Sequence, residues 1–175
     1  MTSPSWRATG AFLLALTMAT GAVGQVSTNR VAADTDWSVF VEEDPKECWG
    51  VSAPKETVNT KDGQAVSVRR GDILLFVTYR PGSAGGEVSF TGGYPFAGGS
   101  TVALDISGTT FELFTDGEWA WSGSKDDDAK IIAALKAGAS AVLTARSGRG
   151  TETKDTFSLL GVSAALDEAA KRCAG

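Results

Sequence analysis

The apolar residues of this chain fall mostly in short runs that are rich in β-branched and aromatic side chains. Clusters of Gly, Asp, Asn and Ser separate the runs, a pattern typical of strands joined by turns. The sequence therefore predicts a mainly β protein. The expected strands are Trp37–Val41, Cys48–Ala53, Ala65–Arg69, Ile73–Tyr79, Glu87–Thr91, Thr101–Ile106, Thr110–Thr115, Glu118–Trp121, Ser140–Arg146 and Thr153–Leu159.

Two of these runs predict different degrees of burial. Residues 73–77 are apolar at every position, which suits a central strand covered on both faces. In residues 101–106 every second side chain is large and apolar, as expected when one face is buried. Glycine-containing turns at 107–108 and 116–117 then predict a three-stranded meander over residues 101–121.

Two further segments carry apolar residues at helical spacing. Ser124 is a good N-cap, and the acidic residues that follow it favour the positive end of a helix dipole. We expect this helix to end at Gly138 and a second helix to run from Ser163 to Cys173. Because strands and helices do not alternate regularly, the pattern favours a β-sandwich with two short helices over a parallel α/β fold.

The N-terminal residues are organised like a secretory signal peptide. Arg7 precedes a short apolar run at residues 11–16, and small residues lead to Gly24. We expect cleavage after Gly24, with cleavage after Ala33 as the alternative. The run is shorter than the roughly 20 apolar residues that a membrane-spanning helix requires, so no transmembrane segment is expected in the mature chain.

Length and composition predict one globular domain after this signal. The chain has 175 residues, of which 42% are hydrophobic and 21 are glycine, as in a folded protein with many turns. A core of this size does not need to divide. We therefore expect a signal peptide at residues 1–24, a polar segment at 25–36 and a single domain at 37–175.

Charge and the absence of histidine argue against several classes of function. The formal net charge is −5, so the field of the protein repels phosphate backbones and no nucleic-acid partner is expected. The sequence contains no histidine, the commonest general base and metal ligand. We therefore predict that the protein is not an enzyme and uses neither a cofactor nor a metal.

The chain contains two cysteines, Cys48 and Cys173. In an exported protein the oxidising compartment favours a disulfide bond between them. Two free thiols, or a bond to a second chain, are the alternatives. An internal bond would tie the sheet to the C-terminal helix and stabilise the fold by roughly 4–5 kcal/mol. The expected location is the periplasm or the exterior of the cell.

Aromatic residues supply the candidates for a partner or ligand surface. Trp119 and Trp121 are two residues apart, so on a strand both point to the same face. They could stack on a sugar or a partner, although packing beneath the first helix is the simpler explanation. Tyr94 and Phe96 lie in the glycine-rich segment 80–99, either as part of a contact loop or as core anchors.

Three polar motifs have simple structural explanations. Arg70-Gly71-Asp72 matches an integrin-binding tripeptide, but a turn before a strand accounts for these residue types. The aspartates at 126–128 are consecutive and lack the alternating ligands of a calcium loop. The segment 147–150 (SGRG) is expected to form a hairpin turn first and an anion contact second.

Four segments together carry a family resemblance. They are EVSFTGGYPF at 87–96, FELFTDGEWAW at 111–121, DDAKIIAALKAG at 127–138 and SGRGTETKDTFSLLGVSAAL at 147–166. Their order and spacing resemble the invasion-associated locus B family of α-proteobacterial envelope proteins, over nearly the whole chain from residue 37 to 173. The resemblance implies an exported, immunoglobulin-like β-sandwich without a defined biochemical activity.

These observations support three hypotheses about function. The first is an exported, non-catalytic interaction protein with an unknown protein partner in the cell envelope or outside. The second is a small-ligand or glycan-binding envelope protein that uses surface aromatics. The third is a hydrolase or isomerase that works with carboxylates and Lys or Arg alone, for which a pocket with two neighbouring carboxylates would be required.

Overall fold

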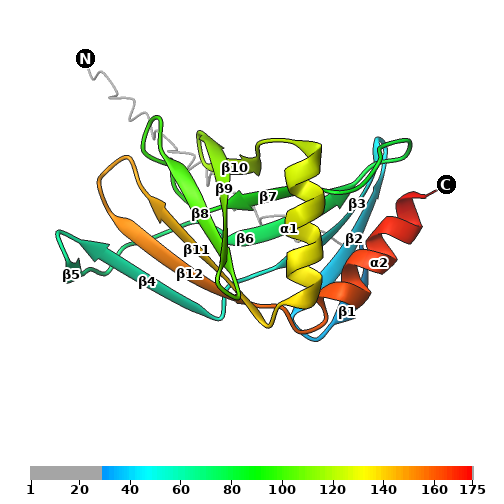
Figure 1. Ribbon diagram of the computed structural model, residues 1–175, viewed down its shortest axis with the longest axis horizontal. Helices are drawn as coiled ribbons and strands as arrows, with labels where there is room; N and C mark the ends of the chain where they lie inside the picture. Colours follow the sequence, from blue (N-terminus) through cyan, green and yellow to red (C-terminus); the bar gives the residue numbers. More distant parts are fainter. Residues whose placement is uncertain (1–28, 175) are drawn as a thin grey trace, which may run out of the picture.

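The computed structural model describes residues 29–174 and is built mainly from β-strands, which confirms the predicted fold class (Figure 1). The predicted signal peptide at residues 1–24 lies outside the described residues. The strands are β1 (Arg30–Asp34), β2 (Trp37–Glu43), β3 (Lys46–Ser52), β4 (Glu56–Lys61), β5 (Gln64–Ala65), β6 (Leu74–Tyr79), β7 (Glu87–Thr91), β8 (Thr101–Ile106), β9 (Thr109–Asp116), β10 (Trp119–Ser122), β11 (Ser140–Arg146) and β12 (Glu152–Ser158), and the helices are α1 (Lys125–Ala137) and α2 (Val162–Cys173).

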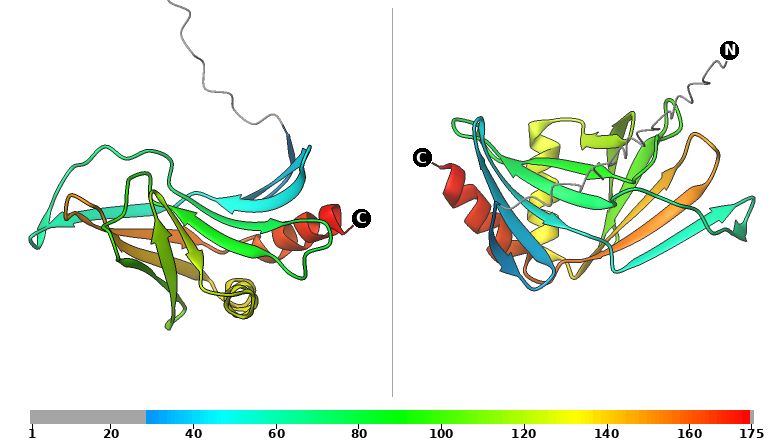
Figure 2. Two further views of the ribbon diagram at one scale, coloured as in Figure 1. Left: turned by 90° about the horizontal axis from the view of Figure 1, so that it is seen from above. Right: turned by 180° about the vertical axis from the view of Figure 1, so that it is seen from behind.

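These strands form one continuous antiparallel sheet in the order β1-β2-β3-β6-β7-β10-β9-β8-β11-β12-β4-β5. The sheet bends so strongly that its two halves face each other (Figure 2). Phe90 of β7 meets Phe157 of β12 edge to face, with ring centroids 6.2 Å apart, although four strands separate β7 from β12 in the sheet order. The two layers of the sandwich are therefore parts of a single folded sheet.

The core lies on the inner side of this bend. Alternate side chains of the strands point into it, for example Val102, Leu104 and Ile106 of β8, as their spacing predicts. Both helices lie on the same side of the β2–β3–β6–β7 part of the sheet (Figure 2). Helix α2 packs on β1, β2, β3 and β6, while α1 contacts β7, β10 and α2.

Both helices begin and end near the predicted residues. Ser124 is the N-cap of α1, where its hydroxyl accepts a hydrogen bond from the Asp127 N–H at 3.2 Å, and Gly138 is the C-cap. Helix α2 follows Gly161, which adopts a left-handed conformation with φ 89°. Its last residue is Cys173, as the sequence predicts.

The strand predictions fail in three places because they rely on apolar alternation. The predicted strand Ala65–Arg69 is wrong, since β5 ends at Ala65 and residues 66–73 form an irregular connection that we call the strap. Strand β4 is missed because its side chains are mostly polar and exposed. Strand β1 lies within the segment 25–36, for which the sequence predicts only a polar stretch.

Strand β6 is also covered differently from the prediction. Leu75 and Val77 are fully buried in the core, in agreement with a central strand. Phe76 between them lies on the outer face of the sheet and remains partly exposed. The continuous apolar run therefore does not indicate cover on both faces, and the outer face of the sheet is partly apolar.

Candidate functional site

The outer face of the sheet carries a row of aromatic side chains, which we call the aromatic stripe. Strand register places them on one face, because residues directly opposite each other on neighbouring strands point the same way. Phe40 pairs with Trp49, and Trp121 pairs with Phe114. The stripe consists of Phe40, Trp49, Phe76, Trp119, Trp121 and Phe114.

Neighbouring rings of the aromatic stripe form three contacts. Phe40 and Trp49 stack with ring centroids 5.8 Å apart and an interplanar angle of 9°. Trp119 lies 5.7 Å from Phe76 and 6.3 Å from Trp121, measured between ring centroids. Phe114 is 55% exposed and Trp119 is 39% exposed. The other four members are partly exposed, and a cluster of solvent-accessible aromatic side chains of this kind is typical of interaction sites.

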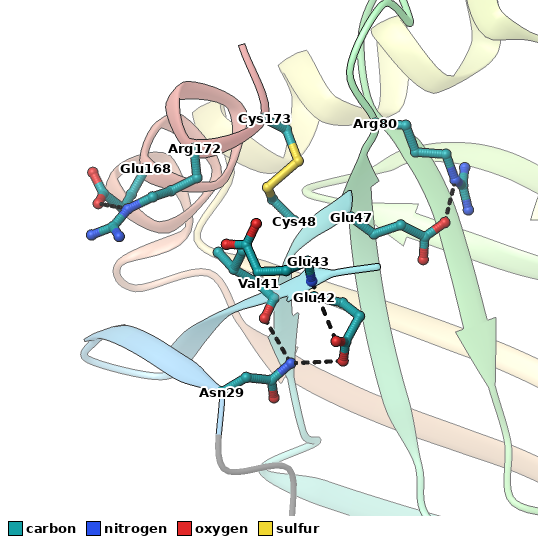
Figure 3. The surroundings of a disulfide bond; sticks show 10 residues. All are labelled: Asn29, Val41, Glu42, Glu43, Glu47, Cys48, Arg80, Glu168, Arg172 and Cys173. Carbon is teal, nitrogen blue, oxygen red and sulfur yellow. Dashed lines mark hydrogen bonds and ion pairs between the residues drawn. A yellow bond between two sulfur atoms is a disulfide. The ribbon is translucent and has the colours of Figure 1, made fainter. Parts of the chain in front are cut away.

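A shallow depression of about 200 Å³ lies within the stripe, between Trp49, Phe76 and Trp119. Glu47 and Ser89 add polar groups to its lining. Further polar groups flank one side of the stripe. The Arg80 Nε donates to Glu47 at 2.6 Å (Figure 3), and a second Arg80 nitrogen lies 3.3 Å from Glu87. The surface thus combines an apolar centre with a charged margin.

Trp119 and Trp121 share a face, as their spacing predicts. Neither tryptophan belongs to the buried core or packs against it, so the core-packing explanation is wrong. Ala120 between them is the fully buried residue of β10, since it points inward while its neighbours point outward. The other four stripe residues are missed by the sequence analysis, because strand register rather than local spacing brings them together.

A second candidate site is a cavity of about 400 Å³ at the end of the sandwich that the strap crosses. Arg70 of the strap lines it and forms a two-point ion pair with Asp155 of β12, with N–O distances of 2.7 and 2.6 Å. The exposed fractions of the two side chains are 6% and 0%. Arg70 is therefore a buried structural residue, and the strap does not present Arg70-Gly71-Asp72 as an adhesion motif.

Tyr94 lies at this cavity and Phe96 lies in the core. The Tyr94 ring is 5.0 Å from the Arg70 guanidinium carbon, and its hydroxyl hydrogen-bonds to Thr153 at 2.6 Å. Burial raises the pKa of Tyr94. Phe96 is only 7% exposed and packs against Tyr94 and Phe90. Phe96 is therefore a core anchor, the second of the two roles that its sequence context allows, and it adds no exposed surface for a partner or ligand.

The acidic residues at the start of α1 serve the fold. Asp128 is buried and accepts hydrogen bonds from the Val88 N–H at 2.8 Å and the Ser122 hydroxyl at 2.6 Å. Burial raises the pKa of Asp128 despite these bonds. Within residues 29–174, no three or more Cys, Asp or Glu side chains are placed to hold a metal ion, and no helix is both long and apolar enough to cross a membrane.

The predicted disulfide bond between Cys48 and Cys173 is present (Figure 3). It joins β3 to the last residue of α2 and excludes the free thiols and the bond to a second chain that the sequence left open. Both cysteines are buried in the core. The C-terminal helix is therefore held on the sheet by packing and by a covalent bond.

Comparison with protein families now identifies the chain. The model of the Invasion associated locus B (IalB) protein family matches residues 37–170. The chain belongs to the IalB family. This confirms the resemblance found in its sequence motifs, and the match contains the whole aromatic stripe and the residues of the strap.

A solved structure shares the IalB fold of this chain. It is the crystal structure of invasion associated protein B from Bartonella henselae, which aligns with a TM-score of 0.53 and 17% sequence identity. The alignment covers 79% of this chain and 94% of the Bartonella chain. At this identity the likeness shows the fold alone. Comparison with curated protein sequences finds no match.

Proposed function

We propose that this IalB-family chain is an exported, non-catalytic interaction protein that binds a partner protein through the aromatic stripe. The observation that carries the proposal is the row of six aromatic side chains on the outer face of the sheet, among which three ring pairs are in contact. Large aromatics on a rigid strand lose little conformational entropy on binding and supply much of the energy of protein interfaces.

The dimensions of the stripe favour a protein partner. It crosses the six neighbouring strands from β2 to β9. Adjacent strands lie about 4.8 Å apart, so the stripe extends roughly 24 Å across the sheet. A standard protein interface buries about 800 Å² on each partner, the area of a patch roughly 28 Å across, so the length of the stripe is comparable. The ion pairs of Arg80 with Glu47 and Glu87 fit the polar rim of such an interface.

Export is supported by two independent features. The first 24 residues have the pattern of a signal peptide, and the Cys48–Cys173 disulfide bond is typical of an oxidising compartment. We propose cleavage after Gly24, because cleavage after Ala33 would remove four of the five residues of β1. The mature chain would then be periplasmic or secreted.

The absence of catalysis is proposed from the chemistry of the side chains. The sequence contains no histidine. The buried ionisable groups are engaged within the fold, Arg70 with Asp155 and Asp128 with the Val88 N–H. A general acid or base needs a group that is free to exchange a proton with a substrate. These groups instead hold the strap and α1 in place.

The test is affinity capture with the mature chain, residues 25–175. We expect one envelope or secreted protein, identified by mass spectrometry and rebound in purified form, to be retained by the wild type and lost with Trp49→Ser/Trp119→Ser. The matched control is Val58→Ser/Leu160→Ser, which removes two exposed apolar side chains away from the stripe. Equal retention of the partner by the stripe variant and the control would refute the proposal.

Glycan binding is a second candidate, favoured by the stacked Trp119 and Trp121 rings and the adjacent depression of about 200 Å³. Sugar faces stack on tryptophan, and the carboxylate of Glu47 could accept hydroxyl hydrogen bonds there. Titration of envelope sugars against tryptophan fluorescence tests this candidate. A saturable change that Trp119→Ser abolishes would replace the protein partner by a glycan, and an unchanged signal leaves the protein interface as the function of the stripe.

A further inference from the structure

The cavity at the strap has the size and position of a ligand site. Its volume is about 400 Å³, within the range of about 300 to 1,000 Å³ that is common for small-molecule sites. Its lining comes from four places, namely the strap, the turn between β11 and β12, residues 93–95 and Glu118. None of these residues belongs to the aromatic stripe, so the cavity is a separate site.

The lining of the cavity is rich in arginine. Arg69, Arg70 and Arg149 contribute three guanidinium groups, and Glu118 is the single carboxylate among the lining residues. Asp155 offsets the charge of Arg70. Within the described chain, residues 29–174, Arg69 and Arg149 form no ion pair. The cavity is therefore locally positive in a chain whose net charge is −5, and such a concave site concentrates anions.

The Arg70 side chain, which forms part of the cavity wall, is held in place by hydrogen bonds. Arg70 donates through Nε to the Gly92 carbonyl at 2.8 Å and through its terminal nitrogens to Asp155 and to Asn59. A guanidinium has five N–H donors, and these bonds use four of them. The remaining Nη2 N–H has no acceptor among residues 29–174, although the Arg70 side chain is only 6% exposed.

The same wall offers an apolar surface beside the charges. Tyr94 is fixed by its hydrogen bond to Thr153 and by the Arg70 guanidinium against its ring. Pro95 and Val68 line the cavity next to it. A site that combines guanidinium groups with an aromatic and an aliphatic surface fits an organic anion better than a bare inorganic ion, because the ligand needs both a charged end and a carbon skeleton.

We propose that this cavity binds a small organic anion, whose carboxylate or phosphate group is held by Arg69 and Arg149 while its carbon skeleton packs against Tyr94 and Pro95. Guanidinium groups recognise both kinds of oxyanion through paired N–H donors. Arg70, held by Asp155, forms the wall beside this anion position. Glu118 disfavours ligands that would place a second negative charge beside it.

The test is isothermal titration of the mature chain with glucose 1-phosphate, glucuronate, inorganic phosphate and glucose. We expect one of the two sugar anions to bind at least tenfold more tightly than glucose and than inorganic phosphate, and to bind more weakly as salt concentration rises. The two sugar anions distinguish a phosphate ligand from a carboxylate ligand. Equal binding of glucose, binding of inorganic phosphate alone, or no binding at all would overturn the proposal.

Variants locate the site on the same protein. Arg69→Gln/Arg149→Gln should weaken binding of the sugar anion at least tenfold, and both side chains are exposed, so the fold should be retained. The control Arg30→Gln/Lys125→Gln removes the same charge at exposed positions outside the cavity and should bind like the wild type. Equal loss in both variants would show general electrostatic attraction and would also overturn the site. The variant Trp49→Ser/Trp119→Ser should bind the anion normally, which separates this site from the stripe.

Discussion

Arg70 and Asp155 lie 85 residues apart in the chain, yet they form a two-point ion pair in which neither side chain is more than 6% exposed. The pair joins the strap to β12, and the Arg70 Nε also donates to the Gly92 carbonyl, just after β7. Because β7 and β12 are not neighbours in the sheet, these side-chain bonds connect two strands that backbone pairing does not. Removing two charges from water is costly, and their attraction offsets that cost only while both partners are present.

We predict that Asp155→Ala lowers the free energy of unfolding by about 3–5 kcal/mol, because it leaves the Arg70 guanidinium buried without a counter-charge. Urea denaturation followed by tryptophan fluorescence measures the change. The double variant Arg70→Met/Asp155→Leu should be less destabilised than Asp155→Ala alone, because it removes both charges. Glu47→Ala, which breaks the exposed pair with Arg80, serves as the control and should cost about 1 kcal/mol or less.

The disulfide bond supports a second prediction. Cys48 and Cys173 are separated by 125 residues, and closing a loop of this length restricts the unfolded chain by roughly 5 kcal/mol in the chain-entropy description. Cys48→Ala/Cys173→Ala should therefore lose about that much stability, and α2 should be the first element to lose protection in hydrogen exchange. Reduction of the wild type should reproduce both effects. Unchanged stability in the double variant would contradict this account of the bond.

The start of α2 supports a third prediction, which concerns Gly161. Its φ is 89°, and a Cβ atom at this position would overlap the Asp34 carbonyl oxygen of β1. Gly161→Ala should therefore destabilise the fold by several kcal/mol, since the backbone of β1 or α2 must shift. Gly108 has a matching φ of 91°, but a Cβ atom there would meet nothing within 4 Å, so Gly108→Ala should cost only about 1 kcal/mol. Equal losses, measured by thermal unfolding, would show that conformation rather than contact decides the effect.

The parts of the fold that local pattern can predict are those with one apolar face. Strand β8 and helix α1 can be predicted in this way, because the apolar alternation of β8 and the Ser124 cap of α1 are signals that span only a few residues. Strand β4 is not, since it pairs with β12 through its backbone while its side chains face solvent. The strap has the pattern of a strand because Val66 and Val68 alternate with polar residues, although neither is buried in the core.

The candidate sites depend on long-range register, which one sequence does not reveal. Trp119 and Trp121 can be recognised as a pair because they share a strand. Phe40 and Trp49 join them only through four successive strand pairings, β2 with β3, β3 with β6, β6 with β7 and β7 with β10. Arg70 belongs to a motif that turn chemistry explains, and its partner Asp155 carries no local signal. Chemistry built from distant segments is therefore visible only in the folded chain.

The last prediction uses two neighbouring aspartates whose pKa values are shifted in opposite directions. Burial raises the pKa of Asp128, so the folded state holds the proton more tightly than the unfolded state and stability falls as pH rises through the window above the ordinary value of 3.8. Hydrogen bonds from Ser124 and Lys130 lower the pKa of Asp127. The ionised Asp127 therefore stabilises the fold above pH 3.8, and this stabilisation is lost as the pH falls below that value. Asp128→Asn keeps an acceptor for Val88 and Ser122 but cannot ionise. The free energy of unfolding of this variant, relative to that of the wild type, should therefore be higher at pH 7 than at pH 2. Asp127→Asn should show the reverse order. Urea titrations at both pH values test the pair, and the same sign for both variants would contradict the burial of Asp128 as the cause.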